Sequence, residues 1–448
     1  MKRMLILLLV IVLIPAIYVG GFILYGMATK FRPEPVEDVA VQASEQPATQ
    51  AISSLDTLSF MTWNIGYGGL GAETDFFYDD GKMITTPQDW VTKYTKGIFA
   101  TVKENQDADF IFIQEADRHG KRSWNVDEVA GIAASAPDHN YAFAVNFDVK
   151  YLPFPLEPWK DKIGPVYGGL LSLSRFAPVE SKRISLPGIP DWPKKIFYLE
   201  RCLLMQRYKL PDDKELVVIN THFEAYDDGS VKKEQMALTK KLLEAEYAKG
   251  NYVILGGDWN IAPPDFNVKK WEKEPNYDKL YEMNNDSNYI QGWKYVYDGN
   301  TPTNRKNSHA FDPNTTFTTV IDYFFVSPNV DVVEVKGVNA GFEYSDHNPV
   351  RMKITLRPEH PVTPPVADSV AADSLGVMEQ DSIAGEQVRA QDAKGTHTTE
   401  SVSDKKIQKR AESPAKKTAT DKDASDGKKP VKKSDKKKKA PEKVSTEE

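Results

Sequence analysis

The sequence predicts a mixed α/β domain in which two β-sheets pack together and helices cover their outer faces. Short apolar runs rich in β-branched residues recur along the middle of the chain, and two longer segments have apolar residues at helical spacing. The same region, residues 58–357, holds all eight tryptophans and nearly all the other aromatic residues. Interleaved strands and helices with an excess of strands are typical of an α/β domain of this kind.

The first element is an apolar segment at residues 4–27. It is long enough to cross a bilayer, which takes roughly 20 helical residues, and it exceeds the roughly 7–15-residue core of a cleaved signal peptide. Lys2 and Arg3 precede it and favour a cytoplasmic N-terminus. We therefore expect a transmembrane signal-anchor over residues 1–29, with the rest of the chain outside the cytoplasm, periplasmic or extracellular. Cleavage after Ala28 is the alternative.

The elements of the domain follow in order along residues 58–357. Residues 89–105 and 231–249 are expected helices, and Gly250 supplies a stop for the second. The single cysteine, Cys202, allows no internal disulfide and lies in an apolar run, so it is expected to be a small core residue. The expected strands are residues 58–63, 110–113, 141–147, 169–173, 202–208, 216–220, 252–255, 321–326 and 350–356.

Polar segments flank the domain on both sides. Residues 30–57 contain three prolines and show no sustained periodicity, so they are expected to be a linker. Residues 358–448 contain no Trp, Tyr or Phe and are rich in lysine. Such a segment cannot bury enough surface to offset chain entropy, and we expect a disordered tail.

Charge is distributed unevenly between the body and the tail. Residues 401–448 hold sixteen Lys/Arg and nine Asp/Glu, a net of +7, and the whole chain carries −7, so residues 1–400 carry −14. An acidic body does not fit a tight, non-specific nucleic-acid binder, which needs cations to neutralise phosphates. A nuclease that binds through a small local patch stays open.

Five short polar blocks carry the candidate chemistry. Most of them follow an apolar strand, so several of their side chains can converge on one pocket at the strand ends. They supply carboxylates, amides and imidazoles, the groups that a divalent metal and a phosphate ester require, and they contain no thiol or basic nucleophile. The blocks are residues 62–66, 114–115, 220–222, 257–260 and 345–349.

The acidic members of these blocks have a physical reason to be functional. Asp258 and Asn260 flank one residue, so in an extended strand end both point the same way. The two glycines before them allow close backbone approach, and a turn with an Asx cap is the structural alternative. Glu115 follows a buried strand, where a carboxylate is costly unless it is paired or binds a metal.

The histidines are candidates for proton transfer. His347 titrates near neutrality and can serve as acid or base, provided that a carboxylate fixes its tautomer. Asp322, at the head of an apolar run, is the candidate carboxylate. His222 and Asn64 also follow apolar strands. For His347 alone a satisfied structural histidine is the stronger interpretation, and for His222 and Asn64 alone a turn residue is an equal alternative. It is the complete set in one order that favours a catalytic site.

On these motifs, residues 58–355 resemble the endonuclease/exonuclease/phosphatase superfamily, which includes pancreatic deoxyribonuclease, apurinic endonucleases, neutral sphingomyelinases and inositol polyphosphate 5-phosphatases. Trp63-Asn64 resembles its first strand-end motif, and Gln114-Glu115 its metal-binding glutamate. Thr221-His222 resembles the first catalytic histidine of the deoxyribonuclease and sphingomyelinase branches.

The later motifs resemble the same family. Asp258 and Asn260 match its Gly-Asp-x-Asn motif, Asp322 matches the aspartate that orients the final histidine, and Asp346-His347 matches its closing motif. The resemblance implies a four-layer α/β sandwich of two packed β-sheets flanked by helices.

The resemblance also implies a metal centre and a phosphate contact. Glu115 with Asn64 is expected to hold Mg²⁺, with Mn²⁺ or Ca²⁺ as alternatives, and Asp346 is expected to add a contact. The metal would polarise a phosphoryl oxygen. Arg201 resembles a phosphate-contacting arginine of the family.

The remaining residues are implied to do the acid–base chemistry. His347, oriented by Asp322, is expected to deprotonate water, and His222 to stabilise the phosphate or protonate the leaving oxygen. Asp258 and Asn260 are expected to position these groups. Which histidine is the acid and which the base stays open at this point.

The sequence thus favours a metal-dependent hydrolase of phosphate esters, foremost a phosphodiesterase that acts outside the cytoplasm on nucleic acid or phospholipid head groups. A phosphomonoesterase of the same fold is one alternative, and an inactive binding or scaffold protein is another. The expected partners are the phosphate-ester substrate and, through the N-terminal anchor, a membrane, with no obligate protein partner. Residues 75–87 and 265–307 are expected to shape the substrate cleft.

Overall fold

The computed structural model describes residues 2–44, 46, 51–53, 56–157, 159–211, 213–225, 229–271 and 289–357. The chain divides into two units, Met1–Glu386 and Gln387–Glu448, and all the described residues belong to the first. The expected disordered tail, residues 358–448, lies outside the described residues.

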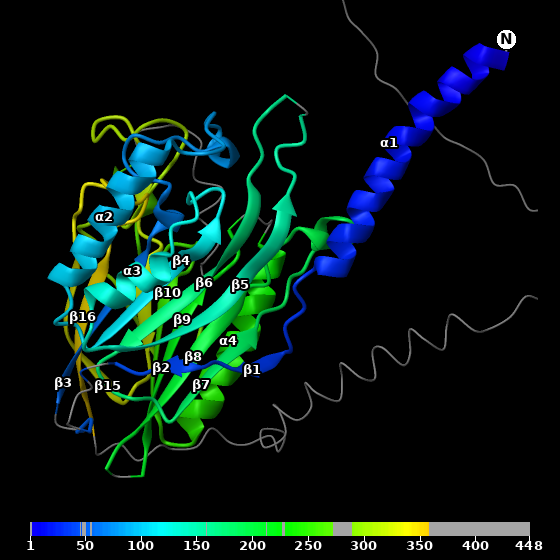
Figure 1. Ribbon diagram of the computed structural model, residues 1–448. Coiled ribbons are helices and arrows are strands. Elements are labelled where there is room, and N and C mark those ends of the chain that lie inside the picture. Colours follow the sequence, from blue (N-terminus) through cyan, green and yellow to red (C-terminus); the bar gives the residue numbers. More distant parts are fainter. Residues whose placement is uncertain are drawn as a thin grey trace, which may run out of the picture. The chain divides into compact units, whose positions relative to one another are not determined.

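Two seven-stranded sheets form the body of the described unit (Figure 1). The first sheet has the spatial order β15 (Val330–Gly337), β16 (Val350–Leu356), β3 (Thr57–Asn64), β4 (Phe110–Gly120), β6 (Gly164–Ser174), β5 (Asn140–Leu152) and β2 (Val41–Gln42). The second has the order β1 (Val36–Asp38), β7 (Glu180–Ser185), β8 (Cys202–Lys209), β9 (Glu215–His222), β10 (Tyr252–Asp258), β14 (Asp322–Val326) and β11 (Lys294–Val296). A separate two-stranded ribbon joins β12 (Asn304–Arg305) to β13 (Thr318–Thr319).

The two sheets pack face to face through large apolar residues. Side chains from both inner faces interdigitate, among them Phe60 and Phe112 from the first sheet and Tyr208, Ile254 and Phe324 from the second. Alternate residues of the same strands point outward, because successive side chains of a strand lie on opposite faces. Each sheet is therefore apolar on both faces and needs a cover on its outer side.

Helices supply that cover. The outer face of the first sheet packs on α2 (Gln88–Glu104) and α3 (Glu128–Ser135), and the outer face of the second packs on α4 (Ser230–Ala248). Asp127 caps α3 by accepting a hydrogen bond from the backbone of Ala130 at 2.9 Å. The result is helix, sheet, sheet, helix, which confirms the predicted four-layer sandwich.

Short 3₁₀ turns and one long apolar helix complete the description. The turns are η1 (Gly66–Gly68), η2 (Phe77–Asp79), η3 (Lys194–Ile196) and η4 (Val268–Trp271). The helix α1 (Lys2–Thr29) includes a 20-residue stretch, Val10–Thr29, that is long and apolar enough to cross a membrane. A signal sequence near an N-terminus has the same properties, so length and composition do not decide between the two.

The structure differs from the sequence-based expectation in three places. The expected strand 110–113 continues to Gly120, and a bulge between Ile113 and Ala116 interrupts its register. The segment 30–57, expected to be a linker, contains β1 and β2, which pair with β7 and β5. Six further elements of the domain have no counterpart in the prediction, because their apolar periodicity is short or weak: α3, β7, β11, β12, β13 and β15.

Strand direction brings the polar blocks to one end of the sandwich. β3 runs parallel to β4 in one sheet, and β9 runs parallel to β10 in the other, so each pair delivers its C-terminal residues to one end of its sheet. The hydrogen bond between Asn64 and Asp258 shows that these two ends meet. β14 runs antiparallel to β10, which places its first residue, Asp322, opposite Asp258. The loop before β16 arrives beside the end of β3, since Val350 pairs with Thr62. We call this end of the sandwich the site end.

Candidate functional site

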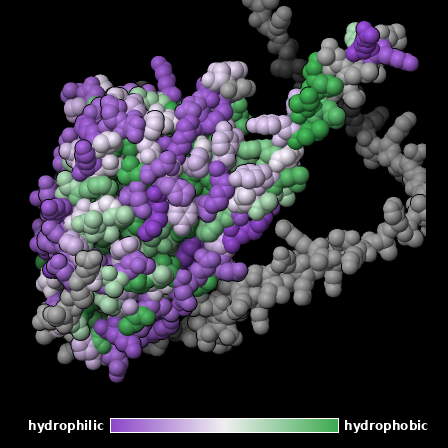
Figure 2. Space-filling model, viewed as in Figure 1, coloured by the Kyte–Doolittle hydropathy of each residue, from purple (hydrophilic) through white to green (hydrophobic). Residues whose placement is uncertain are grey.

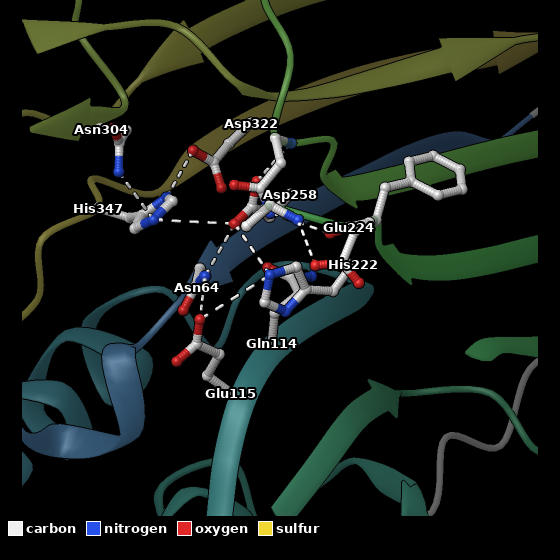
Figure 3. Close-up of polar contacts among 12 residues, drawn as sticks. Asn64, Gln114, Glu115, His222, Glu224, Asp258, Asn304, Asp322 and His347 are labelled. Carbon is white, nitrogen blue, oxygen red and sulfur yellow. Dashed lines mark hydrogen bonds and ion pairs between the residues drawn. The ribbon is translucent and has the colours of Figure 1, made fainter. Parts of the chain in front are cut away.

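Asn64 links the two sheets at the centre of the site (Figure 3). Its amide nitrogen donates to Glu115 Oε1 at 3.1 Å and to Asp258 Oδ2 at 2.9 Å. Its amide oxygen accepts from the backbone of Gly66 at 2.9 Å, which fixes the orientation of the amide. Asn64 therefore holds a carboxylate of each sheet at the same spot.

Glu115 faces the pocket because the strand β4 bulges at this residue. Its φ of 56° lies in the left-handed region, which is strained for a non-glycine residue and often marks a functional position. About 26% of its side chain is exposed, more than for the other charged residues around it. Burial raises the pKa of Glu115, and the nearby Arg122 acts against that shift.

His347 and Asp322 form a buried hydrogen-bonded pair. Asp322 Oδ2 lies 2.8 Å from His347 Nδ1, and Asn304 Nδ2 lies 3.0 Å from His347 Nε2. Burial alone would lower the pKa of His347, but the carboxylates of Asp322 and Asp258 outweigh it and raise the pKa to about 10. The Asn304 amide can turn either its nitrogen or its oxygen toward Nε2, so it suits both the neutral and the protonated ring.

Asp258 lies between the two histidines. Its Oδ2 is 3.4 Å from His222 Nε2 and 3.8 Å from His347 Nε2. Burial and the neighbouring Asp322 raise the pKa of Asp258 to about 6. Gly257 makes this position possible, because a Cβ there would lie 2.0 Å from the carbonyl oxygen of Thr221 on β9.

His222 differs from His347 in its electrostatic environment. Burial lowers the pKa of His222 well below its ordinary value, and the positive charge of Arg201 adds to that effect. Its Nε2 lies 3.8 Å from Glu115 Oε1. The pocket therefore holds one histidine that favours the neutral form and one that favours the protonated form.

Asp346 lies on the rim of the same pocket. Its Oδ2 accepts a hydrogen bond from Asn307 at 2.6 Å, and its negative charge helps to raise the pKa of Glu115. The negative charges of the two carboxylates thus lie near each other. Such an arrangement fits a site that gains stability when a divalent cation binds.

The donor groups of the pocket fit a metal ion chemically. Among the described residues, Asp258, Asp322 and His347 each offer a ligand atom, and these atoms lie within 4.8 Å of one another. Asp322 Oδ1 is buried and has no hydrogen-bond partner. However, both ring nitrogens of His347 already face partners, whereas Glu115 is the most exposed carboxylate of the set, so hard oxygen ligands are most accessible at Glu115.

Two of the predicted residues, Asn260 and Arg201, lie beside the pocket, and their side chains donate hydrogen bonds to backbone carbonyl groups. Asn260 adopts a φ of 50°, and its amide donates to the carbonyl of Phe223 at 3.0 Å. Its own backbone nitrogen donates to Asp258 Oδ1 at 2.8 Å, which is the Asx turn that the sequence offered as an alternative. Arg201 donates to the carbonyl of His222 at 3.3 Å and lies 3.6 Å from Glu224.

Several residues of the site were not predicted. Asn304 lies on β12 and Asn307 follows that strand, both within residues 265–307, which were predicted only to shape the cleft. Arg122 stacks over the ring of Tyr67 at 4.0 Å and pairs with Asp117 at 2.8 Å, directly beside Glu115. Tyr67, which has a left-handed backbone, lies between Gly66 and Gly68 directly after the block 62–66, and nothing in that sequence predicts its contact with Arg122.

A second polar layer supports the site from between the sheets. Gln114 donates to Asn220 Oδ1 at 2.7 Å and to Thr62 at 3.1 Å. Asn220 in turn donates to the carbonyls of Ile113 and Leu171 at 3.1 Å each. These buried bonds tie β9 to β4 and β6 and so fix the distance between the two halves of the pocket.

Comparison with known proteins agrees with this geometry. The family model described as endonuclease/exonuclease/phosphatase family matches residues 61–347. No curated protein matches the sequence. Similar solved structures include an endonuclease/exonuclease/phosphatase from Beutenbergia cavernae, with 20% identity, coverage of 69% of this chain and 73% of that one, and a TM-score of 0.47.

Two further similar structures come from other organisms. A D. rerio TDP2 complexed with a single-strand DNA product has 15% identity, coverage of 67% and 99%, and a TM-score of 0.43. A mannosyl-6-phosphatase of Bacteroides thetaiotaomicron has 18% identity, coverage of 66% and 99%, and a TM-score of 0.40. The family match spans more than half of the chain and includes every predicted motif, from the strand of Asn64 to His347. This chain therefore belongs to the endonuclease/exonuclease/phosphatase family, whose members hydrolyse phosphate esters with the help of divalent metals.

Proposed function

We propose that this chain is a Mg²⁺-dependent phosphodiesterase whose site is centred on Asn64, Glu115, His222, Asp258 and His347. The observation that carries the proposal is the arrangement around Asp258, which has a histidine on each side and is joined to Glu115 through one amide. Phosphoryl transfer to water needs a carboxylate that holds a cation, two imidazoles of which one favours the neutral and one the protonated form, and a carboxylate that positions them.

Glu115 and Asn64 would hold the cation, with Asp346 as a further contact. When bound, the cation would polarise a phosphoryl oxygen and offset charge in the transition state. The Asn64 amide and the Arg122 charge favour the ionised form of Glu115, because both act against the burial that raises its pKa. Mg²⁺ is favoured because few protein oxygens surround Glu115 and the rest of the coordination can be water.

His347 is the group proposed to take a proton from the attacking water. Asp322 holds the Nδ1 side of the ring, so Nε2 faces the pocket. The same carboxylate stabilises the imidazolium that forms when Nε2 accepts the proton. The raised pKa of His347, about 10, favours the protonated ring, whereas the ring must be neutral to accept a proton. The positive charge of a cation held at Glu115 and Asp346 would lower this pKa and so make the neutral form available.

His222 is proposed to contact the phosphate or the leaving oxygen. Asp258, 3.4 Å away, positions it, and Asn260 holds the strand end that carries Asp258. Arg201 lies behind His222 and acts through the backbone bond to it. Its guanidinium is buried and faces Glu224.

A substrate panel tests the proposal and separates it from its alternatives. Bis-p-nitrophenyl phosphate and p-nitrophenyl phosphate would be incubated with the full chain, Mg²⁺, and then excess chelator. We expect hydrolysis of the diester that chelator abolishes and Mg²⁺ restores. Preference for the monoester would favour a phosphomonoesterase, and binding of phosphate compounds without any turnover would favour an inactive scaffold.

We further propose that α1 anchors the protein in a membrane with the catalytic domain outside the cytoplasm. Apart from its first two charged residues the helix carries no charge, and its described side chains are mostly exposed, as expected for a segment whose surroundings are lipid (Figure 2). Digestion of the domain by protease added to intact cells, or to spheroplasts where the domain faces a periplasm, together with a mature N-terminus at Met1 or Lys2, is the expected result, since a cytoplasmic domain would be protected. A mature N-terminus at Thr29 in a soluble fraction would instead identify a cleaved signal.

A further inference from the structure

The C-terminal half of α1 contacts two particular loops of the sandwich. One is the tip of the β5–β6 hairpin, and the other is the segment between β7 and β8, residues 186–201. Phe22 stacks on Phe197 with ring centroids 5.5 Å apart and meets Tyr151 edge-on at 5.9 Å. Gly26 lies against Ile196, so close that a Cβ on the glycine would be 2.6 Å from the isoleucine side chain.

The chain that follows α1 is held against the same region. Lys30 pairs with Glu200 at 2.8 Å, and both side chains are largely buried. Arg183 lies over the ring of Phe31, with 5.6 Å between the guanidinium and the ring centroid. β1 then pairs with β7. No free linker therefore separates the helix from the domain, and Figure 1 shows α1 leaving the sandwich beside the β5–β6 hairpin.

Strand register places both loops at the site end. Val166, near the start of β6, pairs with Gly120 at the end of β4, so the hairpin tip extends beyond the strand that carries Glu115. Leu203, near the start of β8, pairs with Thr221, the residue before His222. The anchor helix, the two loops and the pocket thus share one end of the molecule.

These loops expose apolar side chains that the domain does not cover. Trp159 is 83% exposed, Leu156 is 69% exposed and Trp192 is 55% exposed, and Tyr151 and Ile189 are exposed as well. Outside α1, only four other large apolar side chains of the described residues are exposed: Tyr78, Trp124, Val179 and Val333. We call Tyr151, Leu156, Trp159, Ile189 and Trp192 the apolar rim.

The rim rests on a packed base and is not a pair of loose loops. Phe154 of the hairpin meets Phe197 of the second loop with centroids 6.5 Å apart, and Leu152 and Leu199 join the same apolar cluster. Because these four residues pack together at the base of the two loops, the loop tips project into solvent. The fold itself therefore keeps the apolar rim exposed. Clustered exposed apolar residues of this kind mark an interaction surface.

The chemistry of the rim matches the interfacial region of a bilayer. Tryptophan and tyrosine prefer the head-group level, where the ring is in apolar surroundings and its polar group stays hydrated. Residues 150–162 and 186–201 together hold six Lys/Arg and four Asp/Glu, a net of +2. Such a small charge predicts that apolar contact, and not attraction to anionic lipid, dominates binding.

We propose that the apolar rim inserts into the head-group region of the bilayer that α1 crosses, which holds the site end of the sandwich against the membrane surface. The inference rests on the proposed anchor role of α1. It means that the pocket opens beside the bilayer, so phosphate esters at the membrane surface, lipid head groups above all, are the substrates within direct reach.

Site-specific labelling of the full chain in phosphatidylcholine vesicles tests this. The native Cys202 is buried, and burial raises the pKa of its thiol to about 11, so a cysteine introduced at the surface is labelled selectively at neutral pH. An environment-sensitive fluorophore would be attached to Trp159→Cys and to Trp192→Cys. Val179→Cys is the matched control, because Val179 is 54% exposed and lies at the opposite end of β7 from the second loop. Leu24→Cys reports insertion of α1.

Quenchers attached to lipid at the head group and deep in the acyl chain give the readout. We expect the labels at 159 and 192 to shift to the blue and to be quenched several-fold more than the label at 179, with the head-group quencher the more effective. Equal quenching at 159, 192 and 179 alongside strong quenching at 24 would overturn the proposal. Absence of quenching at 24 would overturn it too, since the anchor would then be missing. Hydrolysis of soluble bis-p-nitrophenyl phosphate by the same variants judges the catalytic assignment separately.

Discussion

Asp322→Asn is the most informative single substitution, because it removes a charge from the site and keeps the size of the side chain. In the native site Asp322 Oδ2 and His347 Nδ1 are 2.8 Å apart and buried. A hydrogen bond between charged partners contributes about 1.5–3 kcal/mol. Since about 1.4 kcal/mol corresponds to a tenfold change in rate, the variant should lose ~10–150-fold in kcat/KM.

The loss should be smaller than that caused by removing the histidine. His347→Ala deletes the proton acceptor itself, and a positioned acid–base group supplies ~10²–10⁴-fold. In Asp322→Asn the ring remains but is poorly oriented. The pH profile adds an independent readout: Asp322 helps to raise the pKa of His347, so without its charge the limb that belongs to this histidine should move to lower pH.

The assay is hydrolysis of bis-p-nitrophenyl phosphate with Mg²⁺, measured over pH and compared with melting temperature. Asp107→Asn is the matched control, because it makes the same chemical change in an exposed ion pair with Arg351 that should matter little. If Asp322→Asn behaved like Asp107→Asn, Asp322 would not orient His347. If its activity fell only in step with a lower melting temperature, Asp322 would be structural.

The other predictions concern the metal, the base, the stability and the tail. His347→Ala should remain folded but lose nearly all turnover, and retention of more than about a tenth of the rate would contradict its role. Glu115→Gln should weaken Mg²⁺ binding, so that a higher Mg²⁺ concentration is needed both to saturate the activity and to reach the midpoint of a calorimetric titration. An unchanged titration would mean that Glu115 is not a ligand of the metal. Arg207→Met should lower the free energy of unfolding at pH 7 by ~2–3 kcal/mol, because it leaves the buried Glu246 with fewer partners. Burial alone would raise the pKa of Glu246, but its bonds to Arg207 lower it, so this stability is present above the unfolded-state pKa and is lost as the pH falls through the folded-state pKa. Chemical denaturation of the wild type and of Arg207→Met should therefore give free energies of unfolding that converge as the pH falls. A difference that stays constant with pH would refute the link between Arg207 and the pKa of Glu246. Deletion of the chain after Arg357 should change turnover by less than about twofold, and a large loss would mean that the lysine-rich tail recruits substrate.

The sequence alone determined the fold class and most of the pocket. Apolar runs and helical spacing located the principal strands and both long helices of the domain to within a few residues, because periodicity is imposed by the sheet or helix in which each residue lies. Asn64, Glu115, His222, Asp258, Asp322 and His347, which the structure brings together, were proposed from the sequence because each lies close to the end or the start of an apolar run. Polar groups at such positions are conspicuous, since burial there is costly without a partner.

The tertiary structure decided which groups touch and in what state. Asn304 reaches His347 through a two-stranded ribbon, and Arg122 reaches Tyr67 across separate loops, without a local sequence pattern that marks either contact. The bulge at Glu115 arises from the register between β4 and β6, so the sequence of the eleven residues of β4 does not reveal it. Protonation preferences are likewise set by burial and by charges from other strands, which lower the pKa of His222 and raise that of His347. A sequence pattern reveals features that depend on residues close together in the chain, such as strands and helices. Contacts between distant segments form only when the two sheets pack and exclude water between them, so no local pattern reveals them.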